Sequence, residues 1–270
     1  MDKKYLAIVF AFSLFLSGCG FSSIESIPTK NGFSFAIPSS QNESEYWMNT
    51  EKLIQDVKKK YNLMFEKSVE VKSFESALKS WDLTDEEVKR NVITKYIIGN
   101  ETYELVGIKF ANPTDNIPEE FAVQLNGKVL FQKPMCFGAE GPIQDVRKIN
   151  GKIAISYVEG ACKYSGEKEV NSRMNIFYDG KTLNEEYKVE GSQYLFAYKN
   201  KIGFVVTDGD KQNIFFYGQK VSDAFDSIPT TQCCASISPL LNVYENGALL
   251  FRGSKENNYY LTEIDLNKYL

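Results

Sequence analysis

Five cysteines are the residues of this sequence most capable of covalent chemistry, and their spacing separates them into two groups. Cys19 stands alone near the N-terminus, whereas Cys136, Cys162, Cys233 and Cys234 lie in the second half of the chain. In an exported protein, four cysteines favour disulfide bonds, with three ways of pairing. We favour Cys136–Cys162, which would stabilise the fold by about 3 kcal/mol. Cys233 and Cys234 are then a vicinal disulfide or two free thiols. A metal–thiolate site is the alternative, but the spacing matches no zinc pattern.

The residues before Cys19 indicate export. Lys3 and Lys4 give a positive start, residues 6–16 are apolar except for Ser13, and small residues precede the cysteine. This is the layout of a secretory signal. Its apolar run is too short to span a bilayer, which takes roughly 20 residues. An uncleaved signal anchor or an unlipidated secretory peptide is the alternative interpretation.

The stretch Leu16-Ser17-Gly18-Cys19 resembles the lipobox of bacterial lipoproteins. The resemblance implies cleavage before Cys19 and a diacylglyceryl group on its sulfur, with two or three acyl chains such as palmitate. Each buried methylene contributes about 0.8 kcal/mol, so two or more chains anchor a protein firmly. We therefore expect an extracytoplasmic protein that is held to a bacterial membrane through lipid on Cys19.

The absence of histidine excludes several chemistries. With no histidine among 270 residues, Ser-His-Asp and Cys-His nucleophiles, histidine-ligated metals and histidine bases are impossible. The net charge is −4, without a basic block, so we expect no nucleic-acid partner. No phosphate-binding or dinucleotide motif occurs, and we expect no cofactor, no bound metal and no enzymatic activity.

Two connections between predicted strands are the candidate binding loops. The first, residues 134–142, is rich in glycine and proline and contains Phe137 and Glu140; the second, residues 230–236, contains Gln232. Long loops on a rigid scaffold often carry function. Glu140 with Glu159 would be the carboxylate pair of a glycosidase, although the sequence does not fix their separation. A disulfide-pinned structural loop is the favoured alternative.

The chain divides into four segments by pattern. We assign residues 1–18 to a signal peptide, 19–30 to the lipidated cysteine and a tether, 31–97 to a strand with a helical segment, and 98–270 to a β-repeat domain. Apolar spacing predicts helices over about 45–61 and around Phe74, Leu78 and Trp81. A capping box at Thr84–Glu87 predicts a third helix that continues through Ile93.

Turn dipeptides dominate the region after about residue 96. Asn-Gly and Asp-Gly pairs lie between β-rich runs and favour tight hairpin turns. They are found at 126–127, 150–151, 179–180, 208–209 and 246–247. Similar elements begin at Asn150, Asn200 and Asn246. Their spacing gives a mean repeat period of about 48 residues.

These repeats resemble the blades of bacterial β-propeller repeat proteins. The resemblance implies a mainly β (α+β) protein of four to five blades, in which the early strand near Phe33–Ile37 completes a blade. An open β-meander or a barrel is the alternative. Tyrosines crowd this region and suit blade packing or a protein or glycan partner at the envelope. The favoured function is therefore a binding or scaffolding module. A carboxylate-dependent carbohydrate-active enzyme on a propeller scaffold is the alternative.

Overall fold

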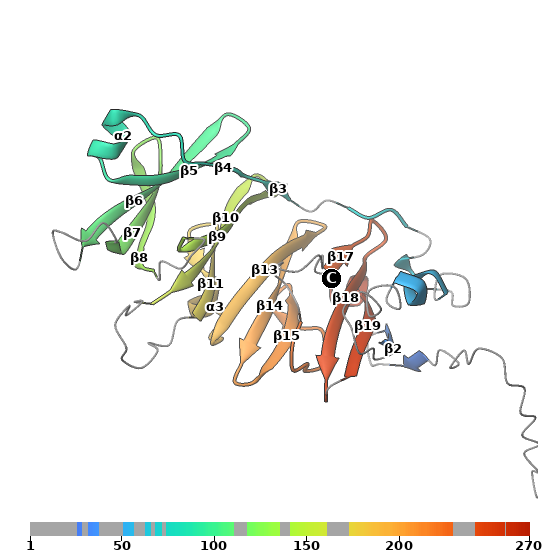
Figure 1. Ribbon diagram of the computed structural model, residues 1–270. Coiled ribbons are helices and arrows are strands. Elements are labelled where there is room, and N and C mark those ends of the chain that lie inside the picture. The colour runs from blue at the N-terminus through green and yellow to red at the C-terminus, as the bar shows by residue number, and fades with distance from the viewer. Residues whose placement is uncertain are drawn as a thin grey trace, which may run out of the picture.

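Four antiparallel sheets stand face to face in a row and form most of the protein (Figure 1). The computed structural model describes residues 26–28, 32–37, 51–56, 63–65, 68–71, 74–110, 118–135, 141–160, 173–228, 241–256 and 258–270. Within these residues, none of the sheets closes on itself. The mainly β prediction is confirmed, whereas a closed propeller is not seen in this part of the chain.

The sheets follow one another in chain order, except that the early strands β1 and β2 join the fourth sheet and β3 joins the second. The first contains β4 (Leu78–Ser80), β5 (Val92–Ile98), β6 (Glu101–Phe110), β7 (Pro118–Leu125) and β8 (Lys128–Pro134). The second contains β3 (Glu75–Ser76), β9 (Ile143–Ile149), β10 (Lys152–Glu159), β11 (Arg173–Tyr178) and β12 (Lys181–Thr182). The third contains β13 (Gly191–Tyr198), β14 (Lys201–Asp208), β15 (Lys211–Phe216) and β16 (Gln219–Lys220). The fourth contains β1 (Ser26–Pro28), β2 (Gly32–Ile37), β17 (Leu241–Val243), β18 (Ala248–Lys255) and β19 (Asn258–Asp265).

All five predicted turn dipeptides lie at connections between strands. Asn126-Gly127, Asn150-Gly151 and Asp179-Gly180 have positive φ at both positions, from 52° to 83°. Such turns match the right-handed twist of the strands that they join. Asparagine, aspartate and glycine adopt this left-handed conformation at little cost, which is why the pattern is readable in the sequence.

Apolar side chains on both faces of the inner sheets hold the row together. On β14, Phe204 and Val206 pack towards the second sheet, whereas Val205 packs towards the fourth. All three side chains are at most 1% exposed. A strand covered on both faces must be continuously apolar. The run Phe204–Val206 therefore reflects the position of the third sheet in the middle of the row.

The early strand joins the fourth sheet, at the far end of the chain. β2 pairs antiparallel with β19, and Phe35 lies opposite Leu261. The outer face of this sheet packs against Leu53, Leu63 and Phe65. These three side chains, each 2% exposed, form an apolar cover over the outer face of the fourth sheet.

An extended segment crosses the row of sheets from the fourth to the first. The Val71 amide donates to the Val243 carbonyl oxygen at 2.8 Å, beside β17. β3 then pairs with β9, and β4 pairs with β5. Phe74 lies in between, with its ring 4.0 Å from the guanidinium carbon of Arg147. Described residues 68–71 and 74–80 thus connect three of the four sheets, as Figure 1 shows along the upper edge.

The helical predictions need correction. The helix expected around Phe74, Leu78 and Trp81 is wrong, because β3 and β4 occupy this region. Pairing with the edges of β9 and β5 satisfies the backbone here, and Leu78 and Trp81 are 69% and 58% exposed. They are not the buried face of a helix. Residues 51–56 are helical, and the rest of the range 45–61 lies outside the described residues.

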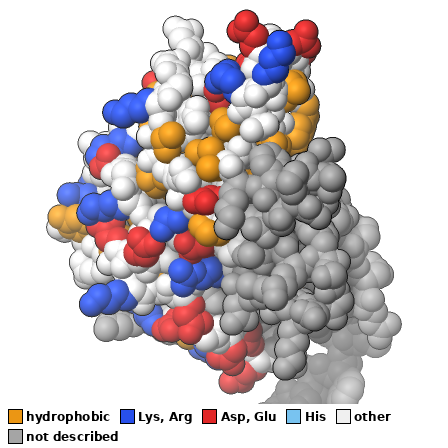
Figure 2. All heavy atoms as spheres, turned by 90° about the vertical axis from the view of Figure 1, so that its left-hand side faces the viewer, with side chains coloured by type: hydrophobic (Ala, Val, Ile, Leu, Met, Phe, Trp, Pro, Cys, Tyr) orange, Lys and Arg blue, Asp and Glu red, His pale blue; other side chains and the backbone are white. Residues whose placement is uncertain are grey.

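The capping box at Thr84 is confirmed, but its helix is short. α2 (Asp85–Lys89) ends before β5, which takes Ile93 into the first sheet. In the described part of the chain, helical turns are also formed by α3 (Leu183–Tyr187) and the 3₁₀ helix η2 (Leu266–Tyr269). The outer face of the first sheet mixes charges of both signs with small hydrophobic groups (Figure 2). Its ion pairs include Arg90–Glu104 at 2.8 Å and Lys95–Glu87 at 3.1 Å.

Candidate ligand-binding cleft

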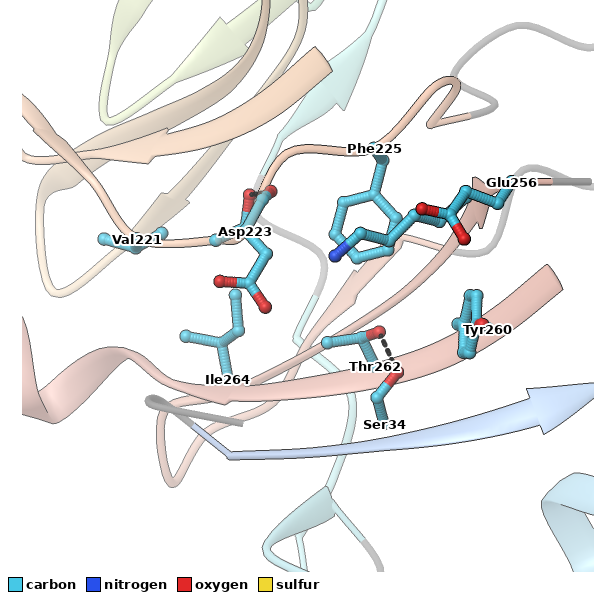
Figure 3. A pocket seen from close by; sticks show the side chains of 10 residues that line it. Ser34, Val221, Asp223, Phe225, Glu256, Tyr260, Thr262 and Ile264 are labelled. Carbon is cyan, nitrogen blue, oxygen red and sulfur yellow. Dashed lines mark hydrogen bonds between the residues drawn. The ribbon is translucent and has the colours of Figure 1, made fainter. Parts of the chain in front are cut away.

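A cleft of about 270 Å³ lies between the third and fourth sheets (Figure 3). One wall is the segment that follows β16, and the other is the inner face of β19 and β2. The lining consists of a buried floor and a charged rim: Ser34, Val221, Ser222, Asp223, Phe225, Lys255, Glu256, Tyr260, Thr262 and Ile264. This volume lies just below the usual range of about 300–1,000 Å³ for small-molecule sites.

Two buried hydroxyl groups form the polar part of the floor. Ser34 Oγ and Thr262 Oγ1 are 3.1 Å apart, on neighbouring strands β2 and β19. The two residues are only 7% and 4% exposed. Each hydroxyl carries one proton, and their mutual hydrogen bond uses only one of the two. The second proton is therefore available to an acceptor in the cleft.

The aromatic wall is fixed by close packing. A Cβ added at Gly253 would lie 2.4 Å from the Phe225 ring, so only glycine allows this approach. The ring also meets Phe251 edge-on, with centroids 5.4 Å apart. Phe225 and Gln212 exchange two backbone hydrogen bonds, of 2.7 and 2.9 Å. The wall is therefore rigid, which favours a preformed site.

Hydrogen bonds join the two sides of the rim. Asp226 accepts from Lys211 Nζ at 2.6 Å and from the Glu256 amide at 2.7 Å. The bond from Lys211, followed by that from the Glu256 amide, lowers the pKa of the Asp226 carboxyl. The amide of Ser254 also donates to the Ser227 carbonyl oxygen at 2.8 Å. These contacts hold the turn that presents Glu256.

Three exposed charged residues surround the opening: Asp223, Lys255 and Glu256. Figure 3 shows Asp223 at one side, near Ile264, and Glu256 at the other, above Tyr260. Two carboxylates and one ammonium group give the rim a net charge of about −1 at neutral pH. The cleft therefore suits a small hydroxylated ligand that carries a positive charge.

The cysteines and the candidate binding-loop residues singled out from the sequence lie outside the described part of the chain. This holds for Cys19, Cys136, Cys162, Cys233 and Cys234, and also for the loop residues Phe137, Glu140 and Gln232. Their disulfide, lipidation and binding roles remain predictions. Glu159 is described: it accepts hydrogen bonds from Arg173 at 2.8 Å and Asn175 at 3.1 Å. Its ion pair gives it a structural role.

Sequence reasoning missed the cleft because its lining comes from three distant segments. Ser34, Phe225 and Thr262 stand in unremarkable local patterns, and only the position of β2 beside β19 brings them together. Small hydroxyl residues flanked by apolar ones, Phe33-Ser34-Phe35 in β2 and Leu261-Thr262 in β19, were a weak local signal. In the described ranges, no group of three or more cysteine, aspartate or glutamate residues is placed to hold a metal ion.

Comparisons with known proteins found no matching family model, no similar curated protein and no similar solved structure. Among the described residues, no helix is long and apolar enough to cross a membrane.

Proposed function

We propose that this protein is a lipid-anchored binding module of the bacterial cell envelope, and that the cleft between its third and fourth sheets holds a small polar ligand. The carrying observation is the buried Ser34–Thr262 hydroxyl pair beneath a charged rim. The second proton of this pair can be accepted by a ligand oxygen in the cleft, where ordered water would otherwise accept it.

The sheet order supports a propeller-like arrangement of this module. Each sheet is an antiparallel meander that packs on the next, and an N-terminal strand completes the last one. Propellers commonly combine chain ends in one blade and bind ligands where blades meet. We propose that the four sheets are blades of an incomplete ring.

The position of β1 supports anchoring close to the cleft. β1 begins at Ser26, seven residues after Cys19, and belongs to the fourth sheet. A fully extended chain spans at most about 3.6 Å per residue, so seven residues reach no more than about 25 Å. Lipid on Cys19 would therefore hold the fourth sheet, which supplies half of the cleft, near the membrane surface.

The anchor is tested by mass spectrometry of the protein purified from bacterial membranes. We expect a mature N-terminus at Cys19 that carries at least two acyl chains, and release of a Cys19→Ala variant from the membrane fraction. An unmodified Cys19 in membrane-purified protein would contradict this proposal.

The cleft is tested with glucosamine, a hydroxylated cation, and with its neutral analogue N-acetylglucosamine. Binding to the folded state raises the thermal midpoint in proportion to RT ln(1 + [L]/Kd). We expect glucosamine to give the larger rise, and Thr262→Val to abolish it while keeping side-chain volume. Thr102→Val, on the first sheet, is the matched control. Equal responses of wild type and Thr262→Val would exclude the cleft.

One observation favours the alternative of a carbohydrate-active enzyme: Asp223 and Glu256 are two carboxylates in the same cleft. Glycoside hydrolysis uses such a pair, one residue as acid and one as base or nucleophile. Release of reducing sugar from bacterial polysaccharides that is lost in both Asp223→Asn and Glu256→Gln would establish this alternative. Binding without turnover supports the module.

A further inference from the structure

A second hollow, of about 570 Å³, lies across the ends of the second and third sheets. Three tyrosines and two lysines define it, and we call it the tyrosine–lysine groove: Tyr178, Tyr187, Tyr217, Lys152 and Lys201. It opens where the turns β9–β10, β13–β14 and β15–β16 come together, in the middle of the row of sheets. It shares no residue with the cleft of Figure 3.

The charge of the groove is opposite to that of the whole chain. The chain has a net charge of −4, yet none of the described residues that line the groove is acidic. Lys152 forms an ion pair with Asp179 beside the groove. Lys201 takes part in none of the ion pairs between described residues, and its Nζ lies 4.0 Å from the centroid of the Tyr217 ring. The ammonium group of this half-buried lysine is thus held over an aromatic face.

The tyrosine rings are ordered by their neighbours. Tyr187 packs against Phe204 with ring centroids 5.1 Å apart, and meets Phe215 edge-on at 6.4 Å. The Tyr178 hydroxyl donates to the Ile149 carbonyl oxygen at 3.5 Å. Rigid rings lose little conformational entropy when they bind a ligand, which makes them efficient contact surfaces.

Tyr217 occupies a backbone position that favours other residues. It has φ of 49° in the β15–β16 turn, ahead of Gly218 at 75°. The same place is taken by Asn126 in the β7–β8 turn and by Asp179 in the β11–β12 turn. A bulky aromatic residue with positive φ is uncommon and strained. The ring is nevertheless 47% exposed, so core packing does not account for it.

We propose that the tyrosine–lysine groove binds an acidic carbohydrate chain. Tyrosine rings offer flat apolar faces to the carbon skeleton of sugar rings, and their hydroxyl tips remain polar. The Lys201 ammonium neutralises a carboxylate of a uronic acid, and the Lys152 ammonium, which also pairs with Asp179, lies along the same groove. The amides of Asn150 and Asn200, which also line the groove, both donate to and accept from sugar hydroxyls. Among the described lining residues, only Ile202 supplies an aliphatic side chain, which leaves little for the side chains of a peptide.

Affinity electrophoresis of the full chain in detergent tests this proposal with three polymers in the gel. We expect retardation by polygalacturonate, a uronic acid polymer, and none by neutral dextran. Polyglutamate carries the same charge on a peptide backbone. Retardation by polyglutamate equal to that by polygalacturonate, or none by polygalacturonate, would overturn the proposal.

Tyr217→Asn separates a binding role from a structural one. We expect the dissociation constant for polygalacturonate to rise by about tenfold, as for truncation of an aromatic hot-spot residue. The thermal midpoint should rise by about 2 °C, because asparagine relieves the strained turn. Tyr259→Asn, at a 40% exposed tyrosine of β19, is the matched control and should leave binding unchanged. Tyr217→Asn with unchanged affinity would overturn the proposal.

Lysine variants then test whether charge acts locally. Lys201→Gln should weaken polygalacturonate binding by at least about fivefold, more strongly at low salt. Lys128→Gln removes an exposed lysine from the first sheet and should have no effect. Equal weakening by the two variants would show a general charge effect and would also overturn the proposal.

Discussion

The first and fourth sheets have similar meanders but end the row in opposite ways. The fourth sheet has an apolar outer face, and Leu53, Leu63 and Phe65 cover it. The first sheet carries ion pairs on its outer face, with α2 beside β5. Its apolar side chains there are scattered among charges (Figure 2). A sheet at the end of a stack can therefore be completed by a hydrophobic cover or by a charged surface.

Two glutamates show the same contrast in electrostatics. Glu263 of the fourth sheet is 4% exposed and accepts a hydrogen bond from the Phe65 amide at 3.0 Å. Burial raises its pKa, although the amides of Phe65 and Met64 oppose this effect. Glu87 of α2 keeps 15% of its side chain exposed, and its hydrogen bond from the Thr84 amide, followed by that from Lys95, lowers its pKa.

Leu261→Ala, in the fourth sheet, should lower the free energy of unfolding much more than a substitution on the outer face of the first sheet. Leu261 is fully buried under the apolar cover, so we expect a loss of about 2–5 kcal/mol in the free energy of unfolding. Val129→Ala, at a 46% exposed position of β8, should change it by less than about 0.5 kcal/mol. Urea denaturation measures both. Similar losses would mean that the cover does not pack as described.

Thr84→Ala tests the charged end and should have an intermediate effect. The Thr84 hydroxyl accepts from the Glu87 amide at 3.3 Å, and the Glu87 carboxylate accepts from the Thr84 amide at 2.6 Å. Loss of the N-cap should cost about 1 kcal/mol in urea denaturation. Thr84→Ser keeps the hydroxyl and should retain most of the stability. A variant Thr84→Ala as stable as wild type would show that α2 contributes nothing to the first sheet.

The smallest expected effect is a dependence of the free energy of unfolding on pH, with opposite signs for Glu263 in the fourth sheet and Glu87 beside the first. The unfolded chain titrates its glutamates near pH 4.3. The folded pKa of Glu263 is higher, so wild type should lose stability relative to Glu263→Gln as pH rises from about 4.3 through that folded value. The folded pKa of Glu87 is lower, so its contribution is complete above about pH 4.3 and is lost as pH falls through its folded value.

Urea denaturation of wild type, Glu87→Gln and Glu263→Gln between about pH 3 and pH 7 measures these slopes. At each pH, the difference between wild type and one variant isolates that carboxyl from the other titrating groups. Slopes of the same sign for the two glutamates would contradict the opposite directions of their pKa shifts.

Local patterns in the sequence determined the strands, the turns and the capping box. The turn at Asn126-Gly127 and the capping box at Thr84–Glu87 depend on backbone conformation and hydrogen bonds within a few residues. They can therefore be recognised without knowledge of distant contacts. The run Phe204–Val206 likewise shows a strand that is covered on both faces. The repeat of similar elements predicted several sheets of similar construction.

Tertiary structure alone decided how these elements combine. The spacing of Phe74, Leu78 and Trp81 suits a helix, but the free edges of β9 and β5 accept β3 and β4. Hydrogen bonds to a distant strand outweigh a weak local preference. Similarly, Ser34 and Thr262 become one polar floor only because β2 pairs with β19, 228 positions away. Such pairings depend on which edges and faces remain exposed after the sheets have formed, and no short stretch of sequence carries that information.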